Sequence, residues 1–140
     1  MTECILLDTG PLVALFSAAD SHHAICNVAF DKLAPPLFTC WPVLTEAAWI
    51  LRKQHLPFDR ISAAQASGMF EILPLENGCL QEIAAIMRRY ADAGLQLADA
   101  ALAYLAEREK IRTIFTLDRR DFSIIRLKRN RALRLIPDVH

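Results

Sequence analysis

The apolar run at residues 4–7 ends in a carboxylate, and this junction constrains the fold more than any other part of the sequence. Asp8 is followed by Thr9, Gly10 and Pro11, which favour a tight turn into a helix. A short apolar run bounded in this way is typical of a strand buried on both faces, as in a parallel sheet covered by helices. We therefore expect Asp8 at the carboxyl end of a central strand, where open α/β sheets place their ligand sites.

Predicted strands and helices alternate along the rest of the chain. Strands are expected at residues 37–40, 70–73, 113–117 and 133–136, and helices near residue 11 and at residues 22–33, 42–54, 58–67, 77–91 and 97–110. An Arg- and Asp-rich loop precedes the last strand, and no tight hairpin signal is present. The pattern predicts an α/β fold, with α/β/α layers around a mostly parallel sheet of four to five strands, in a single domain over residues 1–140.

Composition is consistent with one folded domain in a reducing compartment. The chain has 140 residues, of which 54% are hydrophobic, so a sizeable core is expected, with Trp41 and Trp49 either in it or in a subunit interface. The four cysteines form no C-x-x-C pair and are expected to be reduced and mostly buried. We see no signal peptide and no stretch that approaches a membrane span, so we expect a cytoplasmic protein with no membrane contact.

Charge is balanced overall but unevenly distributed. Lys and Arg total 16, as do Asp and Glu, so the net charge alone does not indicate a nucleic-acid-binding protein. Residues 119–134, however, contain seven Lys and Arg against one acid. This segment is either a solvated surface or a contact for RNA phosphates, and both interpretations stay open. The candidate RNA-binding residues are Arg119, Arg120, Arg126, Lys128 and Arg129.

Four acidic residues that are distant in sequence are expected to meet at one edge of this sheet. Asp8 and Asp118 each end an apolar strand, and the carboxyl ends of parallel strands share an edge. Glu46 lies near the start of the helix that follows the second strand. Asp99 lies in the first turn of the helix that leads into the fourth strand, so that turn returns to the same edge. Asp121 is a possible fifth member.

A cluster of carboxylates indicates a divalent cation, because such groups repel one another when they are buried and unpaired. Mg²⁺ prefers oxygen ligands and keeps several waters. A metal held in this way suits hydrolysis of a phosphodiester, since it activates a water and neutralises charge on the phosphate. Thr9 and Thr116 flank the acids and are expected to hydrogen-bond a carboxylate or a water.

Each acid, taken singly, also has an ordinary structural interpretation. Asp8 suits a helix cap, Glu46 and Asp99 suit first-turn acids that complement a helix dipole, and Asp118 and Asp121 suit loop acids paired with neighbouring arginines. The convergence of four acids favours the functional interpretation.

The same residues resemble the PIN domain, and in particular the VapC-type toxin ribonucleases of bacterial toxin–antitoxin pairs. Each matching motif is weak alone, but all four occur in order across nearly the whole chain. The motifs are Leu6-Leu7-Asp8-Thr9-Gly10-Pro11-Leu12, Thr45-Glu46-Ala47, Ala98-Asp99-Ala100-Ala101-Leu102-Ala103 and Thr116-Leu117-Asp118-Arg119-Arg120-Asp121-Phe122.

The resemblance implies an endoribonuclease that depends on Mg²⁺ or Mn²⁺, is commonly a homodimer, and is neutralised by a small cognate antitoxin. It further implies that Asp8 and Asp99 are direct metal ligands and that Glu46 and Asp118 complete the catalytic, metal-binding quartet. Asp121, Thr9 and Thr116 are implied to be accessory.

Three other functions remain as alternatives. A catalytically silent PIN-like module that binds RNA or protein needs no acidic cluster, and a phosphatase of the haloacid dehalogenase type needs a second acid where this chain has Gly10. A structure-specific DNA nuclease shares the chemistry, and the residues alone do not distinguish it.

Overall fold

A five-stranded parallel sheet forms the centre of the molecule in the computed structural model, which describes residues 3–54 and 56–138. The strand order is β3-β2-β1-β4-β7, and every neighbouring pair is parallel. The strands are β1 (Ile5–Leu7), β2 (Leu37–Thr39), β3 (Phe70–Ile72), β4 (Thr113–Phe115) and β7 (Arg134–Ile136). The predicted α/β class and parallel sheet are confirmed.

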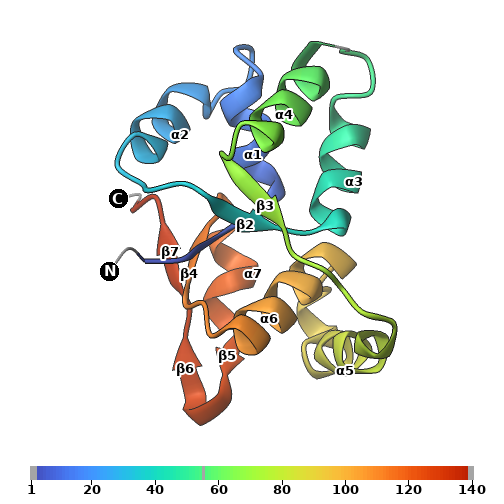
Figure 1. Cartoon of the computed structure of the whole chain (residues 1–140). Helices are drawn as coiled ribbons and strands as arrows, with labels where there is room; N and C mark the ends of the chain where they lie inside the picture. The colour runs from blue at the N-terminus through green and yellow to red at the C-terminus, as the bar shows by residue number, and fades with distance from the viewer. Residues whose placement is uncertain (1–2, 55, 139–140) are drawn as a thin grey trace.

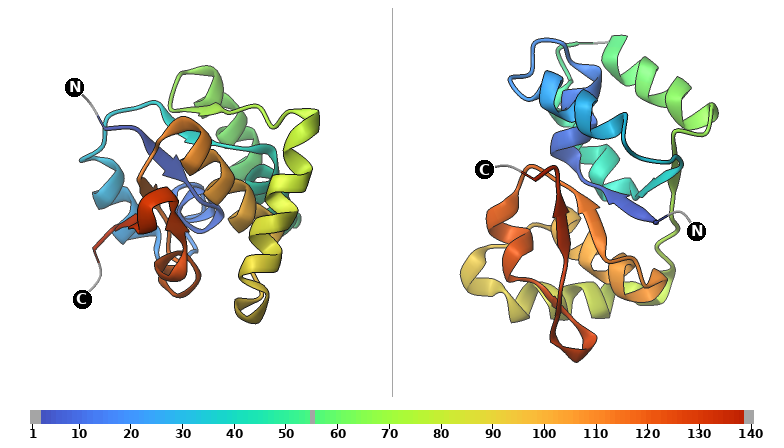
Figure 2. Two further views of the ribbon diagram at one scale, coloured as in Figure 1. Left: turned by 90° about the horizontal axis from the view of Figure 1, so that it is seen from below. Right: turned by 90° about the vertical axis from the view of Figure 1, so that its left-hand side faces the viewer.

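Helices cover both faces of the sheet (Figures 1 and 2). The helices are α1 (Thr9–Phe16), α2 (His23–Phe30), α3 (Trp41–Ile50), α4 (Leu56–Ala66), α5 (Leu80–Arg89), α6 (Leu97–Glu109) and α7 (Arg119–Ile124). Helices α1 to α4 lie together on one side, whereas α5 and α6 pack against each other on the other side. Within the described residues, no helix combines the length and apolarity needed to cross a membrane.

The pairing of β1 with β4 sets the position of the predicted site. Leu7 pairs with Phe115, and the backbone N–H of Asp8 donates to the carbonyl of Phe115 at 3.0 Å. The residues that follow these two strands, Asp8 and Thr116, therefore lie side by side at the carboxyl edge of the sheet. Both strands are fully buried at this point, which fixes the register.

Helix α6 is the most deeply buried helix of the fold. Nine consecutive residues, 98–106, are buried, and five of them are alanines, whose small side chains let neighbouring elements approach closely. The first turn of α6 lies at the carboxyl edge of the sheet, and its last turn lies at the opposite edge, where the chain enters β4. This orientation is the one that the sequence predicts for Asp99.

A two-stranded antiparallel hairpin, β5 (Arg126–Leu127) and β6 (Arg131–Ala132), corrects the expectation that the chain lacks tight hairpins. Its turn contains no glycine, and Arg129 and Asn130 adopt positive φ angles of 63° and 58° instead. The usual Asn-Gly or Asp-Gly signal is therefore absent from the sequence.

The two tryptophans do not belong to the core. Trp41 and Trp49 on α3 keep 63% and 66% of their surface exposed, so the core alternative is wrong and the subunit-interface alternative remains. Arg52 lies over the Trp49 ring, 3.9 Å from its centroid.

Candidate active site

All the predicted acids line one cleft at the carboxyl edge of the sheet. The cleft has a volume of about 460 Å³. Its walls are formed by Asp8, Thr9, Gly10, Glu46, Ile50, Gly94, Gln96, Asp99, Leu117, Asp118 and Asp121. No Lys or Arg is among these lining residues.

The hydroxyl of Thr116 connects two of the acids. Thr116 Oγ1 donates to Asp8 Oδ2 at 2.7 Å and accepts from the backbone N–H of Asp118 at 2.9 Å. Asp8 occupies the N-cap position of α1 but makes no side-chain capping hydrogen bond. The plain interpretation of Asp8 as a helix cap is therefore wrong, and Thr116 instead fixes the orientation of its carboxylate.

Asp99 is held by the start of its own helix. Its Oδ2 accepts from the backbone N–H of Gln96 at 3.2 Å, so it completes the first turn of α6 while the carboxylate stays in the cleft. The first-turn interpretation of Asp99 is thus correct, but it does not exclude a second role. Burial and the nearby charge of Asp8 raise the pKa of Asp99 to about 7.

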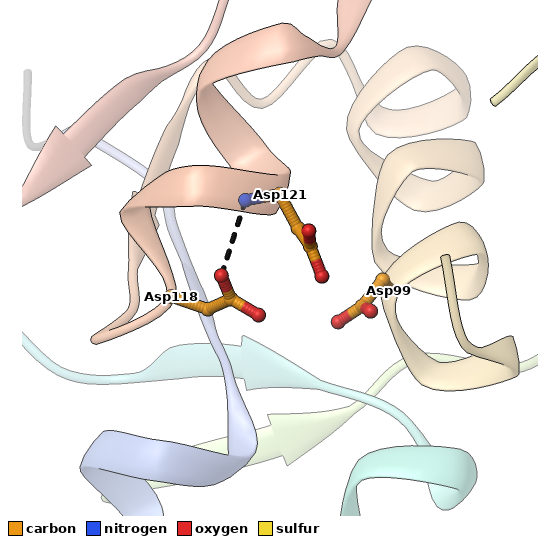
Figure 3. A group of neighbouring side chains, drawn as sticks. All are labelled: Asp99, Asp118 and Asp121. Atoms are coloured by element: carbon orange, nitrogen blue, oxygen red, sulfur yellow. Dashed lines mark hydrogen bonds between the residues drawn. The ribbon is translucent and has the colours of Figure 1, made fainter. Parts of the chain in front are cut away.

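Asp118 and Asp121 come from the start of α7. Asp118 caps this helix, with its Oδ1 accepting from the backbone N–H of Asp121 at 3.1 Å. Figure 3 shows the carboxylates of Asp99, Asp118 and Asp121 converging on the space between α6 and α7. One oxygen from each of the three lies within 4.8 Å of the others, a spacing that a single cation could bridge.

Glu46 reaches the cleft from α3, where it is the sixth residue rather than the first-turn residue that the sequence predicts. It is half-buried, and Thr9 Oγ1 donates to its Oε1 at 3.4 Å. Burial raises the pKa of Glu46. Both threonines that the sequence singles out thus contact a carboxylate of the cleft.

The electrostatics of the cleft are those of uncompensated negative charge. Asp8 and Asp99 are only 6% and 8% exposed, and burial is the main cause that raises the pKa of Asp8 to about 6. The pKa of Asp121 is also raised, by burial and by the charge of Asp118. Within residues 3–54 and 56–138, none of the cleft acids forms a salt bridge with Lys or Arg. An all-oxygen donor set without a protein cation fits Mg²⁺ or Mn²⁺.

Close packing at Gly10 brings the two sides of the cleft together. A side chain here would place its Cβ only 3.3 Å from the Leu117 side chain, so α1 lies against the residue that precedes Asp118. Gln96 and Ile50 also line the cleft, although the sequence does not single them out. Gln96 could not be found from sequence, because it is not one of the residues that usually cap a helix N-terminus (Ser, Thr, Asp and Asn). It contributes through its backbone N–H, which donates to Asp99.

The predicted basic residues lie outside the cleft walls. Arg119 donates to the carbonyl of Pro137 at 2.9 Å, and Arg120 is exposed on α7. Arg126, Lys128 and Arg129 belong to the β5–β6 hairpin. The expected pairing of the loop acids with Arg119 and Arg120 is not found among the described residues.

Comparison with known proteins agrees with this geometry. The family model of the PIN domain matches residues 5–128. Ribonuclease VapC26 of Mycobacterium tuberculosis is 32% identical over 124 residues, which cover 87% of this chain and 92% of VapC26. The fold also matches the crystal structure of VapC20 of Mycobacterium tuberculosis, a sarcin-ricin loop cleaving toxin, with a TM-score of 0.75. The match covers 83% of this chain and 91% of VapC20. Because the sequences are only 18% identical, this similarity concerns the fold. The chain therefore belongs to the PIN-domain family and, within it, to the VapC group.

Proposed function

We propose that this chain is a divalent-metal-dependent endoribonuclease and the toxin of a toxin–antitoxin pair. One observation carries the proposal: five carboxylates, from four separate segments of a PIN-family chain, line one open cleft that contains no basic residue. A scaffold that only binds RNA or protein gains nothing from such mutual repulsion, which costs stability unless a cation compensates it.

The residues that would hold the metal are Asp8, Glu46, Asp99 and Asp118, with Asp121 beside them. Mg²⁺ or Mn²⁺ bound there would lower the pKa of a coordinated water and neutralise charge on the scissile phosphate. Asp99, Asp118 and Asp121 have the closest mutual approach of their oxygen atoms. Glu46 reaches the same cleft from α3.

The other residues of the cleft orient the acids. Thr116 donates to one oxygen of Asp8 and so restrains its carboxylate. The backbone N–H groups of Gln96 and Asp121 restrain Asp99 and Asp118 in the same way. Because three carboxylates are held before any ligand arrives, little side-chain entropy remains to be lost when a metal and a substrate bind.

The remaining assignments follow from the VapC group. We propose an RNA substrate, a small cognate antitoxin that blocks the cleft, a homodimer and a cytoplasmic location. The exposed apolar side chains of Trp41, Trp49 and Ile50 on α3 support a protein interface on this helix. Arg119, Arg120, Arg126, Lys128 and Arg129 remain candidates for contact with RNA phosphates.

The proposal is tested by cleavage of a circular single-stranded RNA, which only an endonuclease can open. We expect cleavage with Mg²⁺ or Mn²⁺ and none with EDTA, and we expect Asp8→Asn to abolish it while the circular dichroism spectrum stays that of the wild type. Calorimetry with Mn²⁺ provides a second readout, since binding should weaken in the same variant. Equal cleavage by the wild type and Asp8→Asn would contradict the proposed site.

A further inference from the structure

A groove at the far end of α6 concentrates positive charge. It has a volume of about 410 Å³ and lies between the end of α6, the start of β4 and the β5–β6 hairpin. Five of its lining residues are cationic, and Glu107 is the one acid among them. We call these residues the basic groove: Lys110, Arg112, Lys128, Arg129 and Arg131, with Glu107.

The cations of the basic groove are not neutralised within the protein. None of the five forms a salt bridge among the residues that the structure describes, and four of them are exposed. Glu107 has a structural role, because its Oε2 accepts from the backbone N–H of Lys128 at 3.1 Å and so ties the hairpin to α6. Like charges gathered without partners lower stability, so an anionic ligand is the natural complement.

Backbone conformation gives a second, independent observation. In residues 3–54 and 56–138, positive φ angles outside glycine occur at Lys110, Arg129 and Asn130, and the first two are cations of the basic groove. Lys110 ends α6 in the left-handed conformation (φ 57°, ψ 40°), where glycine is the usual residue. Backbone conformation therefore does not account for Lys and Arg, rather than glycine or asparagine, at these two positions.

Helix α6 links the basic groove to the acidic cleft. From Asp99 to Lys110 the helix advances eleven residues, or roughly 16 Å at about 1.5 Å per residue. That span corresponds to about five stacked nucleotides at about 3.4 Å each. A larger cavity of about 770 Å³ adjoins the basic groove at Lys128 and reaches Ala103 on α6, although Glu76 and Glu82 also line it. It shares no lining residue with the acidic cleft.

We propose that the basic groove is a second RNA contact, which holds phosphates of a single-stranded substrate several nucleotides away from the bond that lies in the acidic cleft. The proposal rests on the proposed function, because a ribonuclease already carries a polyanionic chain at the other end of α6. It defines the substrate as a strand long enough to reach from one end of this helix to the other.

The strained positions provide variants that remove charge without weakening the fold. Lys110→Gly and Arg129→Asn introduce residues that adopt positive φ more readily than those they replace. The matched control is Lys32→Gln with Arg60→Gln, which removes two exposed cations from the α2 and α4 side of the molecule. Thermal unfolding of both double variants checks that the fold is retained.

Binding is measured by fluorescence anisotropy with labelled single-stranded RNA in EDTA, so that no cleavage occurs. For an RNA of about 16 nucleotides, we expect the groove variant to bind about tenfold more weakly at low salt and to show a salt slope smaller by about 1.4, the value for two lost phosphate contacts. We expect the control variant to bind as the wild type does. For an RNA of about four nucleotides, which is too short to reach from the cleft to the groove, the difference between the groove and control variants should shrink.

Three outcomes would overturn the proposal. The groove variant could bind with the affinity and salt slope of the wild type, or the control variant could lose as much affinity as the groove variant. Third, the wild type could bind polyglutamate more tightly than RNA, with the groove variant losing that polyglutamate binding, which would indicate an acidic protein segment as the ligand. The measurement is separate from the test of the proposed function. If RNA binding depends on the groove but no metal-dependent cleavage occurs, the ribonuclease assignment is wrong and the second RNA contact stands. If metal-dependent cleavage occurs but the groove variant binds RNA as the wild type does, the second RNA contact is wrong and the ribonuclease assignment stands.

Discussion

The two ends of α6 carry opposite charges and achieve this by different means. At the first turn, the acids are buried or half-buried and are held by backbone N–H groups and by Thr116. At the last turn, the cations are mostly exposed and lie on a hairpin and a strained helix end. The acidic end is rigid and suits chemistry that needs fixed geometry, whereas the basic end suits attraction that tolerates many geometries.

The polarity of α6 makes this separation of charge favourable. A helix carries partial positive charge at its N-terminus and partial negative charge at its C-terminus. Asp99 in the first turn and Lys110 just after the last turn each complement the nearer end. The formal net charge of zero therefore conceals a strongly polarised molecule, which composition alone does not reveal.

The largest expected effect comes from neutralising the acidic end. Asp99→Asn keeps a side chain that can accept from Gln96 but removes the charge that a cation needs, so we expect cleavage to fall by more than about 100-fold. Asp59→Asn is the matched control, because Asp59 is an exposed acid in the first turn of another helix, α4. Cleavage of RNA under saturating Mg²⁺ provides the measurement. Retained activity in Asp99→Asn would show that RNA cleavage does not depend on the acidic end of α6.

A smaller loss is expected when the acids lose their positioning hydroxyl. Thr116→Val keeps the shape but breaks the hydrogen bonds to Asp8 and Asp118, so we expect kcat or metal affinity to drop by about 10- to 100-fold. Thr113→Val is the control: Thr113 begins β4, the strand that Thr116 follows, is equally buried, and donates to Glu3 away from the cleft. Equal losses in the two variants would mean that Thr116 acts only through packing.

Metal-free stability should depend on pH with a defined sign. The raised pKa values of Asp8, about 6, and Asp99, about 7, mean that the folded state holds protons that the unfolded chain releases near the ordinary value of 3.8. Their contribution to stability is fully present below the unfolded pKa and is lost as pH rises through about 6 to 7. Denaturant unfolding in EDTA should show a decrease on the order of 1–3 kcal/mol between about pH 5 and pH 8.

Two additions sharpen the same measurement. Mg²⁺ at the higher pH should restore the free energy of unfolding, because it binds the ionised cluster. Asp99→Asn should flatten the metal-free pH profile. A wild-type profile that rises with pH would contradict the picture of uncompensated charge.

The smallest expected effect lies at the basic end. Lys110→Gly replaces a strained L-residue at the C-terminal end of α6, so we expect the free energy of unfolding to increase by about 0.5–1 kcal/mol. Urea unfolding measures it, with Lys53→Gly as the comparison outside the groove. A decrease in stability would show that the Lys110 side chain makes a stabilising contact that outweighs its conformational cost.

The acidic end of α6 could be predicted from sequence, because its position follows from where the strands end and from the parallel topology of the sheet. Asp8 and Asp118 follow strands, and parallel topology is enough to place them at one edge. The contribution of Gln96 could not be predicted, since it is made by a backbone N–H. The basic groove depends on how the hairpin packs on the end of α5 through Tyr90 and on α6 through Glu107, and no local pattern encodes this packing. Its turn also lacks the glycine that marks most hairpins.

The central position of β1 in the sheet has a consequence for synthesis on the ribosome. This strand is made first, but its neighbour β4 is made much later. Thr116, whose hydroxyl donates to Asp8, lies 108 residues after Asp8 in the sequence. A nascent chain therefore holds an incomplete acidic cleft until nearly all of the fold has emerged. Because Asp118 and Asp121 also belong to the cleft, its full set of carboxylates exists only after these late residues have been added.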